Sequence, residues 1–214
     1  MVNDSNNSTD ALNYDGGSEH WSRRPIFAGV LVGGTSSRMG TPKSLLRLQE
    51  TTFLEHVISV TGQRAEQTVL LGSGPTPRVS PDIDQLEDVP GLAGPIAGIM
   101  AALIHRPDVC WLITACDMPY VRIEAVDWLL NERGSDRWAV LPVISPQRFE
   151  RLLAVYEPQS RVLLERIAAR GQRSLEGLAN EPRVHSPTPP EPLHKCWTNV
   201  NTPDELRQLK RDTD

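Results

Sequence analysis

Glycine, hydroxyl and basic residues gather in one stretch directly after the first apolar segment of the chain. The stretch reads Gly33-Gly34-Thr35-Ser36-Ser37-Arg38-Met39-Gly40-Thr41-Pro42-Lys43. Glycines let backbone N–H groups approach phosphate oxygens closely, and Arg38 and Lys43 add positive charge. A surface turn would need none of this, and ligands of open α/β sheets bind at the carboxyl ends of strands. The stretch therefore predicts a phosphate-binding loop.

Two well-known phosphate loops do not match this stretch. A Walker loop needs Gly-Lys-Ser/Thr, but Thr41 and Pro42 separate Gly40 from Lys43 here. A dinucleotide fingerprint needs Gly-x-Gly-x-x-Gly, whereas this loop has adjacent glycines and then a long gap. Neither a P-loop phosphotransferase nor a dinucleotide-dependent oxidoreductase is favoured.

Asp117 follows the apolar run from Trp111 to Ala115. A carboxylate at the end of a buried strand suits Mg²⁺ held against triphosphate oxygens. An Asx-turn or a helix cap is the structural alternative for this residue. Because the glycine-rich loop ends a neighbouring strand, we favour the metal role for Asp117.

Two later motifs carry polar side chains beside small or turn-forming residues. Asp88 opens the stretch 88–98, which is rich in glycine and proline, and its carboxylate suits the N1–H and exocyclic amine of guanine. A solvated loop aspartate is the alternative. In the motif 199–204, Thr202 and Pro203 predict the start of a helix. Asn199 and Asn201 either reach the site or serve only that turn, and both interpretations stay open.

The elements needed to position these residues alternate along the chain. Helices are expected after the N-cap Thr52, whose capping box uses Glu55, and at four later positions. The alternation predicts an α/β domain of three α/β/α layers around a Rossmann-like, mostly parallel sheet. The expected strands are 26–32, 68–71, 109–115, 139–144 and 152–156, the later helices are 96–104, 123–133, 159–169 and 204–211, with a short helix at 174–178 and an extended, proline-rich loop at 182–192.

Length and composition bound the remaining possibilities. The length of 214 residues predicts one domain, expected over 25–214. Residues 1–24 are rich in Asn, Ser, Asp and Gly with almost no apolar content, which predicts a disordered tail. A net charge of −5 argues against nucleic acid or an anionic membrane as partner. Three cysteines do not make a disulfide framework, and Cys110 and Cys116 are expected to be buried and reduced. With no apolar run of membrane-spanning length and no signal-peptide pattern, we expect a cytoplasmic protein.

Taken in order, the four motifs resemble the molybdenum cofactor guanylyltransferases of the nucleotidyltransferase superfamily. The matching residues are Leu31-Val32-Gly33-Gly34 with Arg38 and Lys43, then Gly94-Pro95-Ile96-Ala97-Gly98, Cys116-Asp117-Met118-Pro119 and Asn199-Val200-Asn201-Thr202-Pro203. The resemblance implies a fold of the nucleotide-diphospho-sugar transferase type. It also implies transfer of GMP from Mg-GTP to the terminal phosphate of molybdopterin, with release of pyrophosphate.

Site roles follow from the same resemblance. Lys43, Asp117 and Arg38 would be catalytic, and Asp117 would hold Mg²⁺. Asn199 and Asn201 would position molybdopterin, and cofactor-accepting enzymes would make transient contact. The residues expected to contact GTP are Leu31, Val32, Gly33, Gly34, Lys43, Asp88 and Asp117.

One departure and two alternatives accompany the resemblance. The family often carries Asn directly after its second strand, where this chain has Gly72. A nucleotidyltransferase for another base or acceptor, of cytidylyl or sugar-phosphate type, is one alternative. A GTP-binding module without catalysis is the other, although such a module has no need of Asp117.

Overall fold

The computed structural model describes residues 21–33, 41–48, 50–77, 83–146, 148–171 and 175–213. Within these ranges the largest sheet has seven strands in the order β11-β7-β10-β6-β1-β4-β5. Two small antiparallel pairs, β2 with β3 and β8 with β9, lie outside it. The bounds are β1 Ile26–Leu31, β2 Arg47–Leu48, β3 Thr51–Thr52, β4 Gln67–Leu71, β5 Asp84–Leu86, β6 Cys110–Ala115, β7 Ala139–Val140, β8 Val143–Ser145, β9 Arg148–Phe149, β10 Ala154–Tyr156 and β11 Val184–His185.

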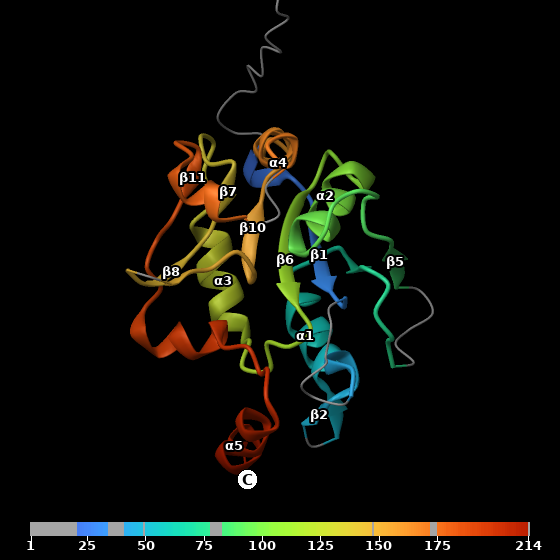
Figure 1. Cartoon of the computed structure of the whole chain (residues 1–214). Coiled ribbons are helices and arrows are strands. Elements are labelled where there is room, and N and C mark those ends of the chain that lie inside the picture. Colours follow the sequence, from blue (N-terminus) through green and yellow to red (C-terminus); the bar gives the residue numbers. More distant parts are fainter. Residues whose placement is uncertain are drawn as a thin grey trace, which may run out of the picture.

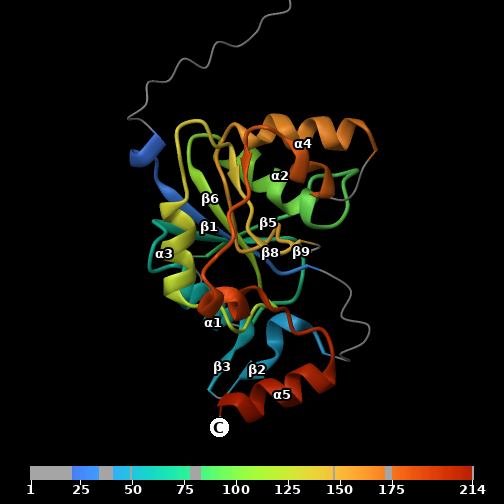
Figure 2. The same ribbon diagram turned by 90° about the vertical axis from the view of Figure 1, so that its left-hand side faces the viewer.

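Helices cover both faces of the large sheet, as Figure 2 shows edge-on. One face carries α1 (Phe53–Thr61) and α3 (Ile123–Asn131), and the other carries α2 (Pro95–His105) and α4 (Ser160–Ala169). Successive residues of a strand point to opposite faces. Leu70 accordingly packs in the core cluster with α1 and α3, while Leu71 packs in the cluster with α2 and α4. The predicted three-layer α/β/α fold is confirmed.

Three neighbouring parallel strands end level with one another. β1 pairs in parallel with β4 on one side and β6 on the other, so that Leu31 lies beside both Leu71 and Ala115. In Figure 1 the arrows of β1 and β6 point downward, and α5 (Pro203–Thr213) and β2 lie beyond their lower ends. The predicted motifs are therefore expected to meet at the carboxyl edge of β1, β4 and β6.

Several helix ends lie where local signals in the sequence predicted them. Thr52 caps α1, its side chain accepting from the backbone N–H of Glu55 while Glu55 accepts from the backbone of Thr52. This is the predicted capping box. Gly171, expected to end α4, has a positive φ of 69°. The terminal helix is also present, extended to Pro203–Thr213.

The predicted strand 139–144 is wrong as a single element. β7 ends at Val140, and β8 begins at Val143 in a separate hairpin with β9. Pro142 lies between them, and proline lacks the N–H needed to continue a ladder. The short helix expected at 174–178 is a 3-10 helix, η3, over Leu175–Asn180.

Two short edge strands lie where no strand was predicted. β5 pairs with β4, and two of its three residues are exposed, so it shows no apolar run. β11 pairs with β7 from within the predicted loop 182–192, between Pro182 and Pro187. The end of that loop enters another 3-10 helix, η4 (Glu191–Trp197). Both strands form by pairing with a strand elsewhere in the sheet, and their own residues show no apolar pattern that would predict a strand.

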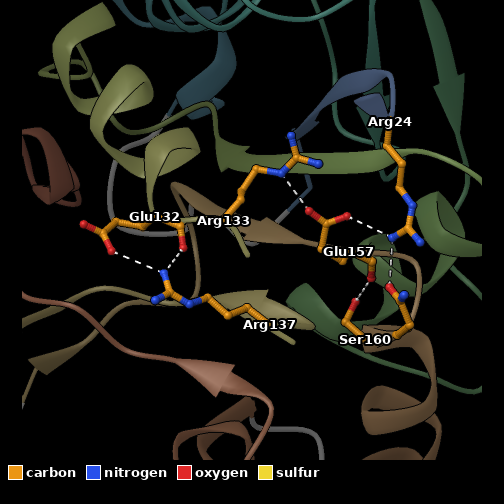
Figure 3. A network of polar contacts seen from close by, with 7 residues as sticks. Arg24, Glu132, Arg133, Arg137, Glu157 and Ser160 are labelled. Atoms are coloured by element: carbon orange, nitrogen blue, oxygen red, sulfur yellow. Dashed lines mark hydrogen bonds and ion pairs between the residues drawn. The ribbon is translucent and has the colours of Figure 1, made fainter. Parts of the chain in front are cut away.

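A buried ionic network joins three elements at the opposite, amino-terminal edge of the strands (Figure 3). Glu157, just after β10, accepts from Arg133 Nε at 2.7 Å and from Arg24 Nη1 at 3.2 Å. The side chains of Arg133 and Glu157 are only 5% and 3% exposed. Of the tail predicted over 1–24, residues 1–20 lie outside the described chain. Trp21–Arg23 forms a 3-10 helix, η1, and Arg24 is tied to Glu157, so ordered chain is described before the predicted start at residue 25.

The three cysteines, Cys110, Cys116 and Cys196, are buried and free, as expected for the first two. Among the described residues, the helices are too short or too polar to traverse a bilayer. The predicted cytoplasmic location stays a prediction.

Candidate active site

A cavity of about 350 Å³ opens at the carboxyl edge of β1, β4 and β6. Its walls come from the strand ends, from the segment around Lys43, from the loop after β4 and from the start of α2. The motifs that the sequence analysis singled out thus converge on one hollow. Its lining residues are Leu31, Val32, Gly33, Pro42, Lys43, Leu71, Pro75, Asp88, Gly94, Pro95, Ala115, Cys116, Asp117, Leu152 and Asn199.

Lys43 begins a short 3-10 helix, η2 (Lys43–Leu45), directly after Pro42. Ser44 is buried, and its hydroxyl donates to the carbonyl oxygen of Pro75. Leu46 packs in a small core cluster with Phe53 of α1. These contacts fix the backbone on which the lysine side chain stands. The ammonium reaches Asp117, with Nζ 2.6 Å from Oδ2.

Asp117 follows the fully buried strand β6, and it is itself only 8% exposed. The preceding residue keeps the ladder going, since Cys116 N–H donates to Leu31 O at 3.0 Å. The carbonyl of Asp117 accepts from Val200 N–H at 2.9 Å, which brings the C-terminal motif to the site. Asn199 Nδ2 lies 3.3 Å from Asp117 Oδ1. The carboxylate therefore has a cation on one oxygen and an amide on the other.

Cys116 lines the cavity but is no nucleophile at neutral pH. Burial, and secondarily the charge of Asp117, raise the pKa of its thiol to about 12. A thiol with that pKa stays protonated, and the thiolate is the reactive form. The cavity therefore offers charge and hydrogen bonds to a ligand rather than a covalent attachment point.

Close backbone approaches shape the wall after β4. A Cβ on Gly74 would lie 1.8 Å from the carbonyl oxygen of Val32, so only glycine fits there. Gly72 has φ +94°, and its N–H and carbonyl bond to Leu86 and to the Gln85 side chain. Gly72 thus ends β4, as predicted. Gly72 has no side chain that could replace the asparagine often found at this position in the family.

Asp88 lies between two glycines. Its Oδ1 would be 3.4 Å from a Cβ on Gly98 and 3.7 Å from one on Gly72. Gly98 stands inside α2, where glycine costs about 1 kcal/mol relative to alanine. Its presence is explained by packing, because a Cβ there would also lie 2.5 Å from Leu31 Cδ2. The carboxylate of Asp88 therefore lies beside two positions that carry no side chain of their own.

Most predicted site residues meet at this cavity. Asn201 does not line it, but its Oδ1 accepts from Lys43 Nζ at 2.5 Å. Gly34 and Arg38 lie outside the described residues. The lining residues expected by the sequence analysis to contact ligands are Leu31, Val32, Gly33, Lys43, Asp88, Asp117 and Asn199.

The sequence analysis missed other parts of the wall. Pro75 belongs to a loop that the glycines and prolines after β4 did signal, although without a role. Leu152 had no such signal, because it precedes β10, which runs antiparallel to its neighbours β6 and β7. Leu153 beside it adopts a positive φ of 51°, and its carbonyl accepts from Trp197 Nε1 at 2.9 Å.

The donor set suits a nucleotide-borne magnesium ion rather than a metal caged by protein. Within the described chain, three or more potential His, Cys, Asp or Glu ligands do not gather at any one place. Mg²⁺ is usually held by one or two carboxylates together with substrate phosphates and water. Asp117, nearly buried at the cavity wall, fits that pattern as the single carboxylate.

Relatives of the chain share its length and its fold. A protein from Bacillus mycoides named "Probable molybdenum cofactor guanylyltransferase" is 28% identical over 86% of this chain and 94% of its own. One of the same name from Bacillus cereus is 30% identical, over 87% and 96%. The crystal structure of molybdopterin-guanine dinucleotide biosynthesis protein A from Archaeoglobus fulgidus superposes with a TM-score of 0.67 at 27% identity, over 87% and 98%.

A more distant structure shares the fold alone. The 2-C-methyl-D-erythritol 4-phosphate cytidylyltransferase of Thermus thermophilus has a TM-score of 0.63 at 15% identity, over 86% of this chain and 97% of its own. The model of the MobA-like NTP transferase domain matches residues 28–186, which contain the glycine-rich loop, Asp88 and Asp117. This chain belongs to the family of MobA-like NTP transferase domains, and it is a nucleotidyltransferase.

Proposed function

We propose that this chain transfers GMP from Mg-GTP to the terminal phosphate of molybdopterin and releases pyrophosphate. The observation that carries the proposal is the convergence of Lys43, Asp117 and Asp88 on one cavity at the sheet edge. The names of the relatives from Bacillus and Archaeoglobus support the choice of base and acceptor.

The chemistry is a substitution at the α-phosphorus of GTP. A bond forms between an acceptor phosphate oxygen and the α-phosphorus, and the bond from the α-phosphorus to the pyrophosphate oxygen breaks. The nucleophile is already ionised, so the site needs no strong general base. Both reactants are anions, and catalysis then consists of holding them in line and offsetting charge.

Lys43 is the described cation best placed for that task. Its ammonium stands at the cavity wall, where it can stabilise the negative charge that grows on the departing pyrophosphate. Mg²⁺, when bound with the nucleotide at Asp117, would supply further positive charge to the phosphate oxygens. We also propose Arg38 as a partner of Lys43, on the strength of the motif alone.

Asp88 is the proposed reader of the base. A carboxylate accepts hydrogen bonds in pairs, and guanine presents two adjacent donors, N1–H and the exocyclic amine. Gly72 and Gly98, the two glycines beside this carboxylate, place no side chain of their own next to it. Cytosine and uracil do not present the same donor pair, so Asp88 favours GTP over CTP and UTP.

A turnover assay tests the proposal. The purified chain is supplied with molybdopterin, Mg²⁺ and each of the four nucleoside triphosphates in turn, and pyrophosphate release is measured. GTP should support turnover and the other three should not. Turnover with CTP or UTP instead, or GTP binding without pyrophosphate release, would overturn the proposal.

Asp88→Asn provides the arm that tests the base. The amide presents both a donor and an acceptor, so one contact to guanine is lost and the preference for GTP should fall about tenfold or more. Asp84→Asn is the matched control, because Asp84 lies nearby on β5 but contacts Gln67 rather than the cavity. Equal selectivity in both variants would remove Asp88 from the base site.

A further inference from the structure

Two asparagines of the C-terminal motif contact the charged residues of the site. Asn201 Oδ1 accepts from Lys43 Nζ, and Asn199 Nδ2 donates to Asp117 Oδ1. We propose that Asn201 is a positioning residue for Lys43, and that the first turn of α5 holds Asn201 in place. This inference rests on the proposed function only in assuming that Lys43 contacts the triphosphate.

Alternation along the segment 199–201 explains how both asparagines face the site. Neighbouring residues of an extended segment point to opposite sides. Val200, between them, is 1% exposed and packs with Leu46, Phe53 and Leu209. Its N–H bonds to the carbonyl of Asp117. The buried valine and that backbone bond turn the two amide side chains toward Lys43 and Asp117.

The first turn of α5 then fixes the backbone of Asn201. The N–H groups of Asn201 and Thr202 both donate to Glu205 Oε2, at 2.6 and 3.1 Å. Glu205 N–H in turn donates to Thr202 Oγ1 at 3.2 Å. This is a capping box extended by one residue. Figure 2 shows α5 lying alongside the β2–β3 hairpin, beyond the carboxyl edge of the sheet that bears the site.

The type of residue at position 201 matters as much as its place. A lysine ammonium stands on a flexible four-carbon stem, which loses rotamer entropy when it is fixed. An amide oxygen directs the ammonium without adding a charge that competes with phosphate. Asp117 already supplies one negative charge to Lys43. A second carboxylate in place of Asn201 would hold the lysine away from the triphosphate.

The competing interpretation is that Asn201 contacts only the acceptor. Binding measured without any acceptor separates the two. Calorimetry would compare Mg-GTP and inorganic Mg-tripolyphosphate, which has neither base nor ribose, on wild type, Asn201→Ala, Lys43→Ala and the double variant. Residues in contact are energetically coupled, so Asn201→Ala should weaken binding of both probes about fivefold. In the Lys43→Ala background the further loss should stay below about twofold.

Two results would overturn the inference. One is unchanged affinity for both probes in Asn201→Ala, which would leave the asparagine to the acceptor. The other is an equal loss with and without Lys43, which would show that Asn201 acts by another route. Asn201→Asp adds a check on charge, because it should weaken tripolyphosphate binding further than Asn201→Ala does.

Two neighbouring acids on α5 test the contribution of the helix. Glu205→Ala removes the bonds to Asn201. Asp204→Ala removes an equal charge from the same turn, where the Asp204 side chain is 85% exposed and pairs with Arg207. Glu205→Ala should raise KM for GTP about threefold, with KM for the acceptor unchanged, and Asp204→Ala should stay within about twofold of wild type. Equal changes in KM for GTP in the two variants would show that the first turn of α5 does not hold Asn201 in place.

Failure of the proposed function remains distinguishable. If wild type binds tripolyphosphate but transfers another nucleotide, the base or acceptor was misassigned, and the comparison of Asn201 variants still decides the inference. If wild type binds neither probe nor any nucleoside triphosphate in the presence of Mg²⁺, Lys43 has no triphosphate to contact and the inference fails with the function.

Discussion

Replacing Glu157 by alanine should cost a large part of the stability of the fold. The carboxylate accepts from Arg133 Nε at 2.7 Å and from Arg24 Nη1 at 3.2 Å (Figure 3). Its backbone carbonyl also accepts from the Ser160 hydroxyl, but that bond survives the substitution. The loss is therefore confined to the charge.

The magnitude follows from how deeply each arginine lies. The Arg133 side chain is 5% exposed, and breaking such a buried pair costs about 3–5 kcal/mol because a charge is left without compensation. Arg24 is 21% exposed and adds at most about 1 kcal/mol. Cys110 cannot take over as the anion, because its burial, which the substitution leaves in place, raises the pKa of the thiol well above the ordinary value. We expect a total near 4 kcal/mol.

Urea unfolding followed by tryptophan fluorescence measures this loss. With an m-value of about 2 kcal/mol/M, the midpoint should fall by about 2 M. The double variant Glu157→Leu with Arg133→Met should recover most of the stability, since it removes the buried charge of Arg133, while the more exposed Arg24 keeps its bond to Gln159. Asp127→Ala is the control, because the Arg64–Asp127 pair is 42% exposed on both sides, and such exposed pairs contribute little to stability.

The reasoning would be refuted if Glu157→Ala shifted the midpoint no more than Asp127→Ala does. Activity adds a second check. Glu157 lies after β10, beside the amino end of β6, whereas the cavity lies at the carboxyl end of β6. The kcat of Glu157→Ala, measured well below its unfolding midpoint, should therefore remain within about twofold of wild type.

Four further predictions address the site and its supports. Asp117→Ala should abolish Mg²⁺-dependent pyrophosphate release while the far-ultraviolet circular dichroism stays unchanged; retained turnover would contradict its role. Gly74→Ala should cost at least about 3 kcal/mol by urea unfolding, because its Cβ would lie 1.8 Å from the carbonyl oxygen of Val32, whereas Gly91→Ala, at a positive φ but in open space, should cost about 1 kcal/mol. A thiol reagent at pH 8 should modify no cysteine in the native chain and all three after denaturation, since all are buried and the pKa of Cys116 is about 12. Hydrogen bonds from Thr52, the N-cap residue of α1, lower the pKa of Glu55. The ionised carboxylate therefore stabilises the fold above the unfolded-state pKa of about 4.3, and this stabilisation is lost as the pH falls. The difference in unfolding free energy between wild type and Glu55→Gln should accordingly narrow below about pH 4.

Elements with a local cause were predictable from the sequence. The capping box of α1 lies within four residues, and the apolar run of β6 is buried on both faces. β5 and β11 were not predictable in this way. They are edge strands of two or three residues whose pairing depends on β4 and β7, and a polar trio such as Asp84–Leu86 carries no strand pattern of its own.

The contacts within the site also differ in how far the sequence could predict them. Lys43 and Asp117 each follow a strand on the same sheet edge, so their meeting follows from topology once a parallel sheet is inferred. The partner of Asn201 does not follow from topology. It lies 158 residues from Lys43, and the contact depends on Val200 inserting into a small core between α1 and α5. A motif resemblance can name Asn201, but only the packing of its neighbour shows which group its amide faces.

The charges at the cavity constrain what can bind there. Among the described residues that line it, one cation, Lys43, stands against two carboxylates, Asp88 and Asp117. Lys43 is moreover already bonded to Asp117 at 2.6 Å. A triphosphate and an acceptor phosphate are both anions, and a site with this balance would repel them in a low-dielectric cavity. Two such anions can share the cavity only if positive charge arrives with them or from the glycine-rich loop. That balance is the electrostatic reason for proposing Mg-GTP, rather than free GTP, as the substrate, and for proposing Arg38 beside Lys43 in the transfer.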